Sequence, residues 1–188
     1  MIVVAAAVLS VLLVPLLGGR LGRLGALRLR RSWLVPAALG LQVLVITVFP
    51  QAEPRLLAAV HVGTYVLAGA FLWLNRAVPG LLLLGAGAAC NGGTIALNGG
   101  VLPASAGALE RSGFRLDPGE FTNSGVLEDP VLPWLGDVLW VPAGVPLANV
   151  FSVGDVMVVA GLAWLVHATC GSRLPRPGRR GRAASPRS

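Results

Sequence analysis

Long apolar runs alternate along the chain with short polar or basic stretches. Five runs consist almost entirely of apolar side chains, and each approaches the length of about 20 residues that a helix needs to cross a bilayer. These runs are Ile2–Leu17, Leu34–Phe49, Leu56–Leu74, Pro79–Leu97 and Val150–Thr169. The pattern predicts five membrane-spanning helices, with the fourth, which is rich in Gly and Ala, packed at the centre.

Arginines lie between these runs in two clusters. The first run is followed by Arg20, Arg23, Arg28, Arg30 and Arg31, and six more arginines lie between Arg173 and Arg187. Because basic loops stay on the cytoplasmic side of a membrane, this distribution predicts an N-terminus outside and a C-terminus in the cytoplasm.

The long segment of residues 98–149 should lie outside. Its second half, Val131–Val150, is apolar but contains three prolines, Pro133, Pro142 and Pro146. Prolines argue against a clean span, whereas Trp134 and Trp140 suit the level of the lipid headgroups. We expect this half to form an interfacial or re-entrant helix.

The predicted fold class is therefore all-α: a polytopic transmembrane helix bundle of about five spans with an outer capping loop. Residues 1–170 would form a single transmembrane domain, and residues 171–188 a disordered basic cytoplasmic tail. In an alternative with four spans, the first run is removed or lies flat, and the other helices keep their orientation. Both alternatives place the protein in the plasma membrane as a multi-pass protein.

Composition agrees with this class, since 55% of the residues are hydrophobic and 12% are charged, which is outside the range of soluble domains. All fifteen basic residues are Arg, and together with abundant Ala, Gly and Pro this is typical of a GC-rich bacterial genome. The net charge of +7 comes mostly from the arginines that the predicted topology places in the cytoplasm. The basic stretches lack the interleaved aromatics of nucleic-acid-binding proteins. The expected partners are the lipid bilayer and a membrane protein, without nucleic acid.

Polar residues inside the runs predict one site that opens outward. Asn91, Thr94 and Asn98 recur at i, i+3 and i+7, so they share one helix face. His61 and Asp155 lie at a similar depth from the outer boundary, at about 1.5 Å per residue. The expected site is lined by His61, Asn91, Thr94, Asn98, Ser152 and Asp155, with Asp137 brought over it by the capping loop.

Each of these residues also has a plainer interpretation. Asp155 is then an acid favoured by the helix dipole, with Ser152 as the N-cap three residues before it. Asp137 is then an acid in an interfacial turn. His61 and the Asn and Thr side chains are then interhelical hydrogen-bonding residues, worth about 1 kcal/mol each. Neither metal-ligand spacing nor a phosphate-binding glycine loop is found in the sequence, so no cofactor or metal is expected.

Several motifs together resemble one family. They are Asn91, Asn98-Gly99-Gly100 with Pro103, Leu135-Gly136-Asp137, and Val150–Asp155 followed by an apolar run. The combination resembles a family of small bacterial membrane proteins catalogued as domain of unknown function number 5317, from about the first run to Val166. The resemblance implies a membrane protein and supplies no activity. Leu102 stands where many members have Met, a volume-conserving difference that indicates packing.

A second similarity concerns the segment Asn149–Asp155 alone. It resembles the Phe-Asn-x-Ala-Asp element of lipoprotein signal peptidases, in which two aspartates form a dyad near the outer surface. The resemblance implies that Asp155 is catalytic with Asp137 as its partner, two carboxyl groups sharing one proton to activate water. The match departs from the family pattern at Ser152, where an Asn is expected.

Two classes of function follow from these observations. The first is a structural or accessory membrane protein whose polar site holds the bundle and its cap together or binds a partner. The alternative is a membrane-embedded aspartic-type hydrolase that uses Asp155 and Asp137. Transport is a more distant third class. The five short runs show no inverted repeat, and they contain only one well-placed intramembrane acid.

Overall fold

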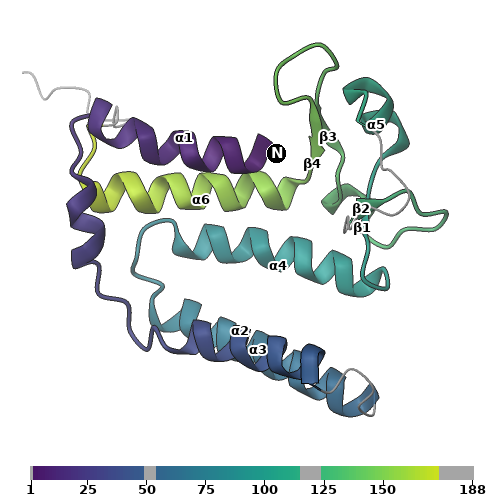
Figure 1. Cartoon of the computed structure of the whole chain (residues 1–188), viewed down its shortest axis with the longest axis horizontal. Helices are drawn as coiled ribbons and strands as arrows, with labels where there is room; N and C mark the ends of the chain where they lie inside the picture. The colour runs from purple at the N-terminus through teal and green to yellow at the C-terminus, as the bar shows by residue number, and fades with distance from the viewer. Residues whose placement is uncertain (1, 49–53, 115–123, 174–188) are drawn as a thin grey trace, which may run out of the picture.

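A computed structural model of the chain describes residues 2–48, 54–114 and 124–173 (Figure 1). Within these ranges, the side chains of residues 42, 45–48, 54–59, 61 and 62 are outside the description. Five apolar helices lie side by side: α1 (Ile2–Leu16), α2 (Leu34–Val48), α3 (Pro54–Leu74), α4 (Leu81–Leu97) and α6 (Val153–Cys170). Across the molecule, α1 is followed by α6, then by α4, and then by the hairpin of α2 and α3.

The closest packing in the molecule joins α4 to α6. Gly80 and Gly87 lie seven residues apart at the start and in the middle of α4, and Gly154 and Gly161 have the same spacing on α6. A Cβ atom on Gly87 would meet the backbone of Gly154, and one on Gly161 would meet the backbone of Leu84. These glycines therefore let two antiparallel backbones approach closely, as small residues do between membrane helices.

The far end of α6 is joined to α1. Val14, Val166 and Cys170 form a buried cluster between the two helices. The backbone amide of Arg20 donates to the carbonyl of Cys170 at 3.0 Å, and that of Arg173 donates to Leu17 at 2.9 Å. Arg173, within the predicted tail of residues 171–188, is thus bonded to the bundle. Residues 174–188 lie outside the described residues, and the tail stays a prediction.

The α2–α3 hairpin is attached mainly at one end of the bundle. Leu34, Phe71 and Leu81 form a buried cluster there. Asn75, which follows α3, is 3% exposed and accepts a hydrogen bond from the Arg30 amide at 2.7 Å while donating to the Arg30 carbonyl at 2.9 Å. This side-chain amide holds the loop before α2 as a neighbouring strand would.

A small cap covers the opposite end of the bundle (Figure 1). The parallel pair β1 (Leu102–Pro103) and β2 (Ser124–Gly125) precedes and follows the short helix α5 (Ala106–Ser112). A 3-10 turn, η2 (Pro133–Leu135), leads into the antiparallel hairpin β3 (Leu139–Val141) and β4 (Asn149–Phe151), in which Trp140 faces Val150. Strand β4 runs directly into α6.

The all-α bundle of five spans is wrong. The described residues include two small sheets, and only α6 is both long and apolar enough to cross a membrane. Length is the physical reason for three helices: α1 and α2 have 15 residues each and α4 has 17, which gives about 22 to 26 Å against a hydrocarbon core of about 30 Å. Helix α3 has 21 residues, and among the described residues its apolar part is Gly63–Leu74.

The interfacial or re-entrant helix expected in Val131–Val150 is wrong as well. This segment forms η2 and the β3–β4 hairpin instead. The three prolines explain the difference, because each removes an amide donor that a helix would need. Pro133 begins the turn, and Pro142 and Pro146 lie in the connection between the two strands.

Candidate functional site

Three polar side chains meet where α4 passes the start of α6. The Asn91 side-chain amide donates to Oδ1 of Asp155 at 2.8 Å, and the Ser152 hydroxyl donates to Oδ1 of Asn91 at 2.8 Å. The Ser152 amide donates to Oδ2 of Asp155 at 3.0 Å, and the Asp155 amide donates to the Ser152 hydroxyl at 2.9 Å. We call these three residues the Asn91–Ser152–Asp155 cluster.

The local sequence explains half of this cluster. Ser152 is the N-cap of α6 and Asp155 is its third helical residue, and together they form a capping box. Each side chain satisfies a backbone amide that the first turn leaves free, and the carboxylate lies at the positive end of the helix dipole. The hairpin of β3 and β4 delivers Ser152 to this position in an extended conformation.

Close packing explains the other half. Ser152 is fully buried, and Gly154 lies directly against the Asn91 side chain, where a Cβ atom would collide with Oδ1 of Asn91. Gly154 therefore makes the room in which Asn91 reaches both Ser152 and Asp155. Each oxygen of Asp155 accepts one hydrogen bond, and each polar atom of the Asn91 side chain takes part in one. The cluster is therefore a closed hydrogen-bond network, which lowers the energetic cost of burying polar groups.

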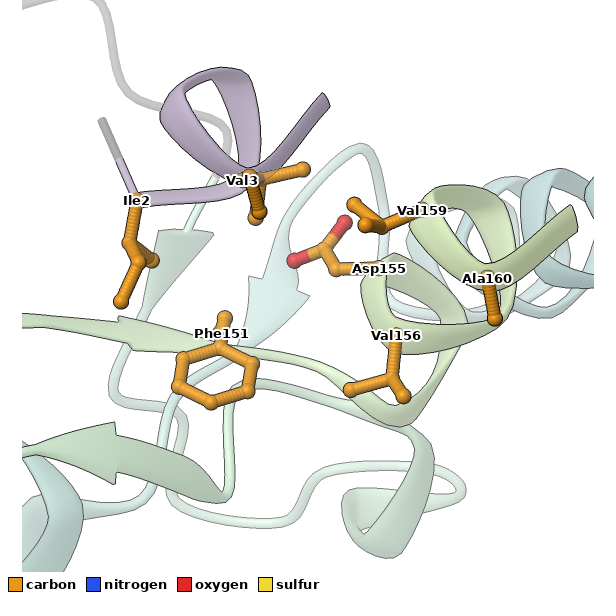
Figure 2. Close-up of a pocket in the computed structure, with 8 residues that line it drawn as sticks. Ile2, Val3, Phe151, Asp155, Val156, Val159 and Ala160 are labelled. Carbon is orange, nitrogen blue, oxygen red and sulfur yellow. The ribbon is translucent and has the colours of Figure 1, made fainter. Parts of the chain in front are cut away.

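A cavity of about 300 Å³ adjoins the cluster between the starts of α1 and α6. Figure 2 shows Asp155 extending from α6 toward α1, near Val3, Val159 and Phe151. Asp155 is the one ionisable residue among those that line this cavity. The acid thus stands at the edge of an apolar space, while its oxygens are held by Asn91 and Ser152.

Asp137 lies in the cap, beside β1. Its amide donates to Pro103 at 2.8 Å, and its carbonyl accepts from Ser105 at 3.0 Å. The residue is 5% exposed, and its carboxyl group accepts a hydrogen bond from the Ser124 hydroxyl at 2.6 Å. Burial raises the pKa of Asp137, the Ser124 bond lowers it, and the negative charge of Asp155 raises it further.

The two aspartates are therefore electrostatic neighbours without being bonded to each other. Asp137 is bonded to Ser124, and Asp155 is bonded to Asn91 and Ser152. A shared proton between two carboxyl groups, which an aspartic dyad needs, would require a direct contact. The described arrangement instead gives each carboxyl group its own partner.

The remaining residues of the expected polar site are arranged differently from the expectation. Asn98, at the end of α4, accepts from the Val131 amide and donates to the Val131 carbonyl, both at 2.8 Å, and so holds the cap. Thr94 is fully buried, and within the described part of the chain its hydroxyl has no hydrogen-bond partner. His61 belongs to α3, but its side chain lies outside the described residues.

Two sets of residues were missed at the level of sequence. Asn75 follows a helix and holds the backbone of a distant segment through a pair of hydrogen bonds, as Asn98 does. An Asn directly after an apolar run is the available signal for Asn75. Gly154 and Gly161 repeat the seven-residue spacing of Gly80 and Gly87, which is also readable in the sequence.

Among residues 2–48, 54–114 and 124–173, no group of three or more His, Cys, Asp or Glu side chains could hold a metal ion. Cys90 and Cys170 are both free thiols. The Asn91–Ser152–Asp155 cluster itself offers carboxyl, amide and hydroxyl groups.

Comparison with known proteins gives one match. The chain matches the family described as "Family of unknown function (DUF5317)" over residues 26–167, which begins after α1. No curated protein and no solved structure matches the chain. The resemblance to lipoprotein signal peptidases accordingly finds no support.

Proposed function

Because the chain belongs to the family of unknown function DUF5317, which assigns no activity, we propose from the structure that it is an integral membrane protein with a structural or accessory role. In this role the Asn91–Ser152–Asp155 cluster and Asn98 hold the helices and the cap in one arrangement. The cap then presents a fixed surface to a membrane protein partner.

The observation that carries this proposal is the large apolar surface of the helices. Side chains on every described helix of the bundle are more than half exposed, among them Val4, Leu12, Leu39, Val66 and Trp164. A helix that is apolar all round must be buried in protein or in lipid, and here much of that surface is not covered by protein. Exposed apolar surface on this scale favours a bilayer as the surrounding solvent.

The distribution of charge supports the same proposal. Among the described side chains, seven arginines lie in the α1–α2 connection, in the α3–α4 turn and after α6: Arg20, Arg23, Arg28, Arg30, Arg31, Arg76 and Arg173. The described acids lie at the opposite end, in the cap and at the start of α6: Glu110, Glu128, Asp129, Asp137 and Asp155. Arg111 in α5 is the described arginine at the cap end. An excess of arginine at one end of the apolar helices is the pattern expected of a membrane protein.

The orientation follows from this separation. With the basic end in the cytoplasm of a bacterial cell, the cap and the N-terminus lie outside, and α6 crosses the plasma membrane from the outside inward. Helix α6 is the segment whose length and composition suffice for crossing. The other apolar helices pack beside α6, surrounded by lipid.

Membrane extraction and labelling test the proposal together. Cys90 and Cys170 would be replaced by Ala, and a single cysteine would then be placed at Glu110 in α5 or at Arg28 before α2. After an alkaline carbonate wash the protein should stay in the membrane pellet. In intact cells an impermeant maleimide should label position 110, whereas position 28 should react only after lysis. Release by carbonate, or labelling of both positions in intact cells, would contradict the proposal.

A second candidate function, a membrane-embedded aspartic-type hydrolase, is favoured by one observation. The pKa of Asp137 is raised first by burial and further by the charge of Asp155, and two carboxyl groups that influence each other are a feature of aspartic-type hydrolases. An Asp137→Asn variant separates the two candidates, because a hydrolase would lose its activity while remaining folded. In the structural role, the effect of this variant is confined to stability.

A further inference from the structure

A second cavity, of about 520 Å³, lies between the α2–α3 hairpin and α4. Its walls are mainly apolar side chains and glycines of three helices, and Thr64 and Tyr65 of α3 also line it. The apolar side chains include Val35 and Leu39 on α2, Phe71 on α3, and Leu81 and Leu84 on α4. Along α4 it extends from Leu81 to Ala89, about 12 Å at 1.5 Å per residue. Its size is within the range of sites for small molecules.

Two contacts between α3 and α4 border the cavity. Leu72 packs on Gly85, where a Cβ atom would lie 2.5 Å from Cδ1 of Leu72. Seven residues away on each helix, the Tyr65 hydroxyl lies 3.2 Å from the Cβ position of Gly92. The positions between these two contacts carry small residues, which cannot fill the gap: Ala68, Gly69, Ala88 and Ala89.

The end of the cavity near Phe71 and Leu81 is flanked by arginines. Asn75 holds the backbone of Arg30, so this backbone lies beside the residue that precedes Arg76. The Arg76 guanidinium donates to the Trp73 carbonyl at 2.9 Å and lies 4.5 Å from the centre of the Trp73 ring. Both arginine side chains are exposed. No acid among the described residues lies at this end of the bundle.

From this placement we propose that the cavity is a binding site for one anionic phospholipid. An acyl chain occupies the apolar space between α3 and α4, and the phosphate group lies against Arg30 and Arg76. The inference rests on the proposed membrane location, where acyl chains surround the helices. Basic positions beside an apolar gap between helices on the cytoplasmic side are suited to anionic lipid headgroups.

The test measures the lipid that stays with the purified protein. The whole chain would be expressed in a bacterial membrane, purified in an uncharged detergent, and mixed with dioleoyl phosphatidylglycerol or dioleoyl phosphatidylcholine. Native mass spectrometry then counts the bound lipid. The wild-type protein should hold one phosphatidylglycerol, and its affinity for this lipid should exceed that for phosphatidylcholine by about tenfold or more. Both lipids carry a phosphate, but the positive charge of choline offsets it, so two arginines favour the lipid with the net negative headgroup.

Two pairs of variants separate the acyl site from the headgroup site. Gly69→Leu should abolish binding of both lipids by filling the cavity, whereas Gly63→Leu is its control on the same helix. A Cβ atom at either glycine meets nothing within 4 Å, and Gly63 does not line the cavity. The double substitution of Arg30 and Arg76 by Gln should remove the preference for phosphatidylglycerol, and Arg20→Gln at the same end should not.

The outcomes are distinct. If the protein stays in the membrane but binds both lipids equally, or if Gly69→Leu binds lipid like the wild type, the lipid site is refuted and the proposed membrane location stands. If carbonate releases the protein from the membrane, the proposed function fails and the lipid site fails with it.

Discussion

The side-chain amide of Asn91 donates a hydrogen bond of 2.8 Å to Oδ1 of Asp155, joining α4 to α6 across 64 residues of sequence. The other half of the Asn91 amide accepts from Ser152, so one side chain connects both members of the α6 capping box. This arrangement gives Asp155 a complete structural role at the start of the helix. It also explains why an ionisable residue can be tolerated beside an apolar cavity.

The cap of α6 should contribute measurably to stability. Replacing the fully buried Ser152 by Ala removes the acceptor of the Asp155 amide and a donor to Asn91, so the free energy of unfolding should fall by about 1 to 2 kcal/mol. Ser105, the N-cap of α5, is a matched control, because its bond to the Ala108 amide is long at 3.4 Å. Ser105→Ala should cost only a few tenths of a kcal/mol, by unfolding in detergent micelles. Equal losses in the two variants would contradict a special role for Ser152.

Close contact between α4 and α6 should make Gly161 intolerant of a side chain. In Gly161→Ala the added Cβ meets the backbone of α4 at Leu84, and backbone atoms cannot move aside as a flexible side chain can. We expect a loss of about 1 to 3 kcal/mol. Gly93→Ala is the control on α4, since a Cβ atom there meets nothing within 4 Å and Ala favours helix. Thermal unfolding should show a clear decrease for the first variant and no decrease for the second.

Asp137 predicts a specific dependence of stability on pH. Its pKa is raised in the folded state, chiefly by burial and further by the charge of Asp155. The folded state therefore holds the proton more tightly than the unfolded state does, and the stability that this proton confers is present in full below the ordinary value of 3.8. It is lost as the pH rises through the raised pKa.

Asp137→Asn should remove this dependence. Between about pH 8 and about pH 4, the melting temperature of the wild-type protein should rise relative to that of the variant as the pH falls. The difference reflects one carboxyl group regaining its proton. If the melting temperatures of the two proteins change in parallel over the whole pH range, the pKa of Asp137 is not raised in the folded state.

The sequence predicted the helices much better than it predicted the cap. Apolar runs bounded by Pro, Gly and Arg marked the helices to within a few residues, because side-chain hydropathy directly reports which segments avoid water. The sequence predicts an interfacial helix where the β3–β4 hairpin forms, because Trp140 and its apolar neighbours are compatible with either structure. The pairing of β3 with Asn149–Phe151 depends on a contact that no local sequence pattern reveals.

The candidate site was predicted in part. Reasoning from depth along α4 and α6 placed Asn91 near Asp155 and Ser152, and the structure joins these three residues. The same reasoning added Asn98, which instead binds Val131 about two turns along α4 from Asn91. Depth along a helix does not fix which neighbour a side chain turns toward, and this explains the difference. The partner of Asp137, Ser124, lies in a loop, where spacing carries no such information.

A double-mutant cycle on Asn91 and Asp155 tests the central claim most directly. The free energy of unfolding in detergent micelles would be measured for Asn91→Ala, Asp155→Ala and the double variant, with Cys90→Ala as the control beside Asn91. If the bond between α4 and α6 is structural, the two substitutions should be coupled by about 1 to 2 kcal/mol. Additive effects to within about 0.3 kcal/mol, together with an Asp155→Ala variant as stable as the wild type, would contradict the structural role of Asp155.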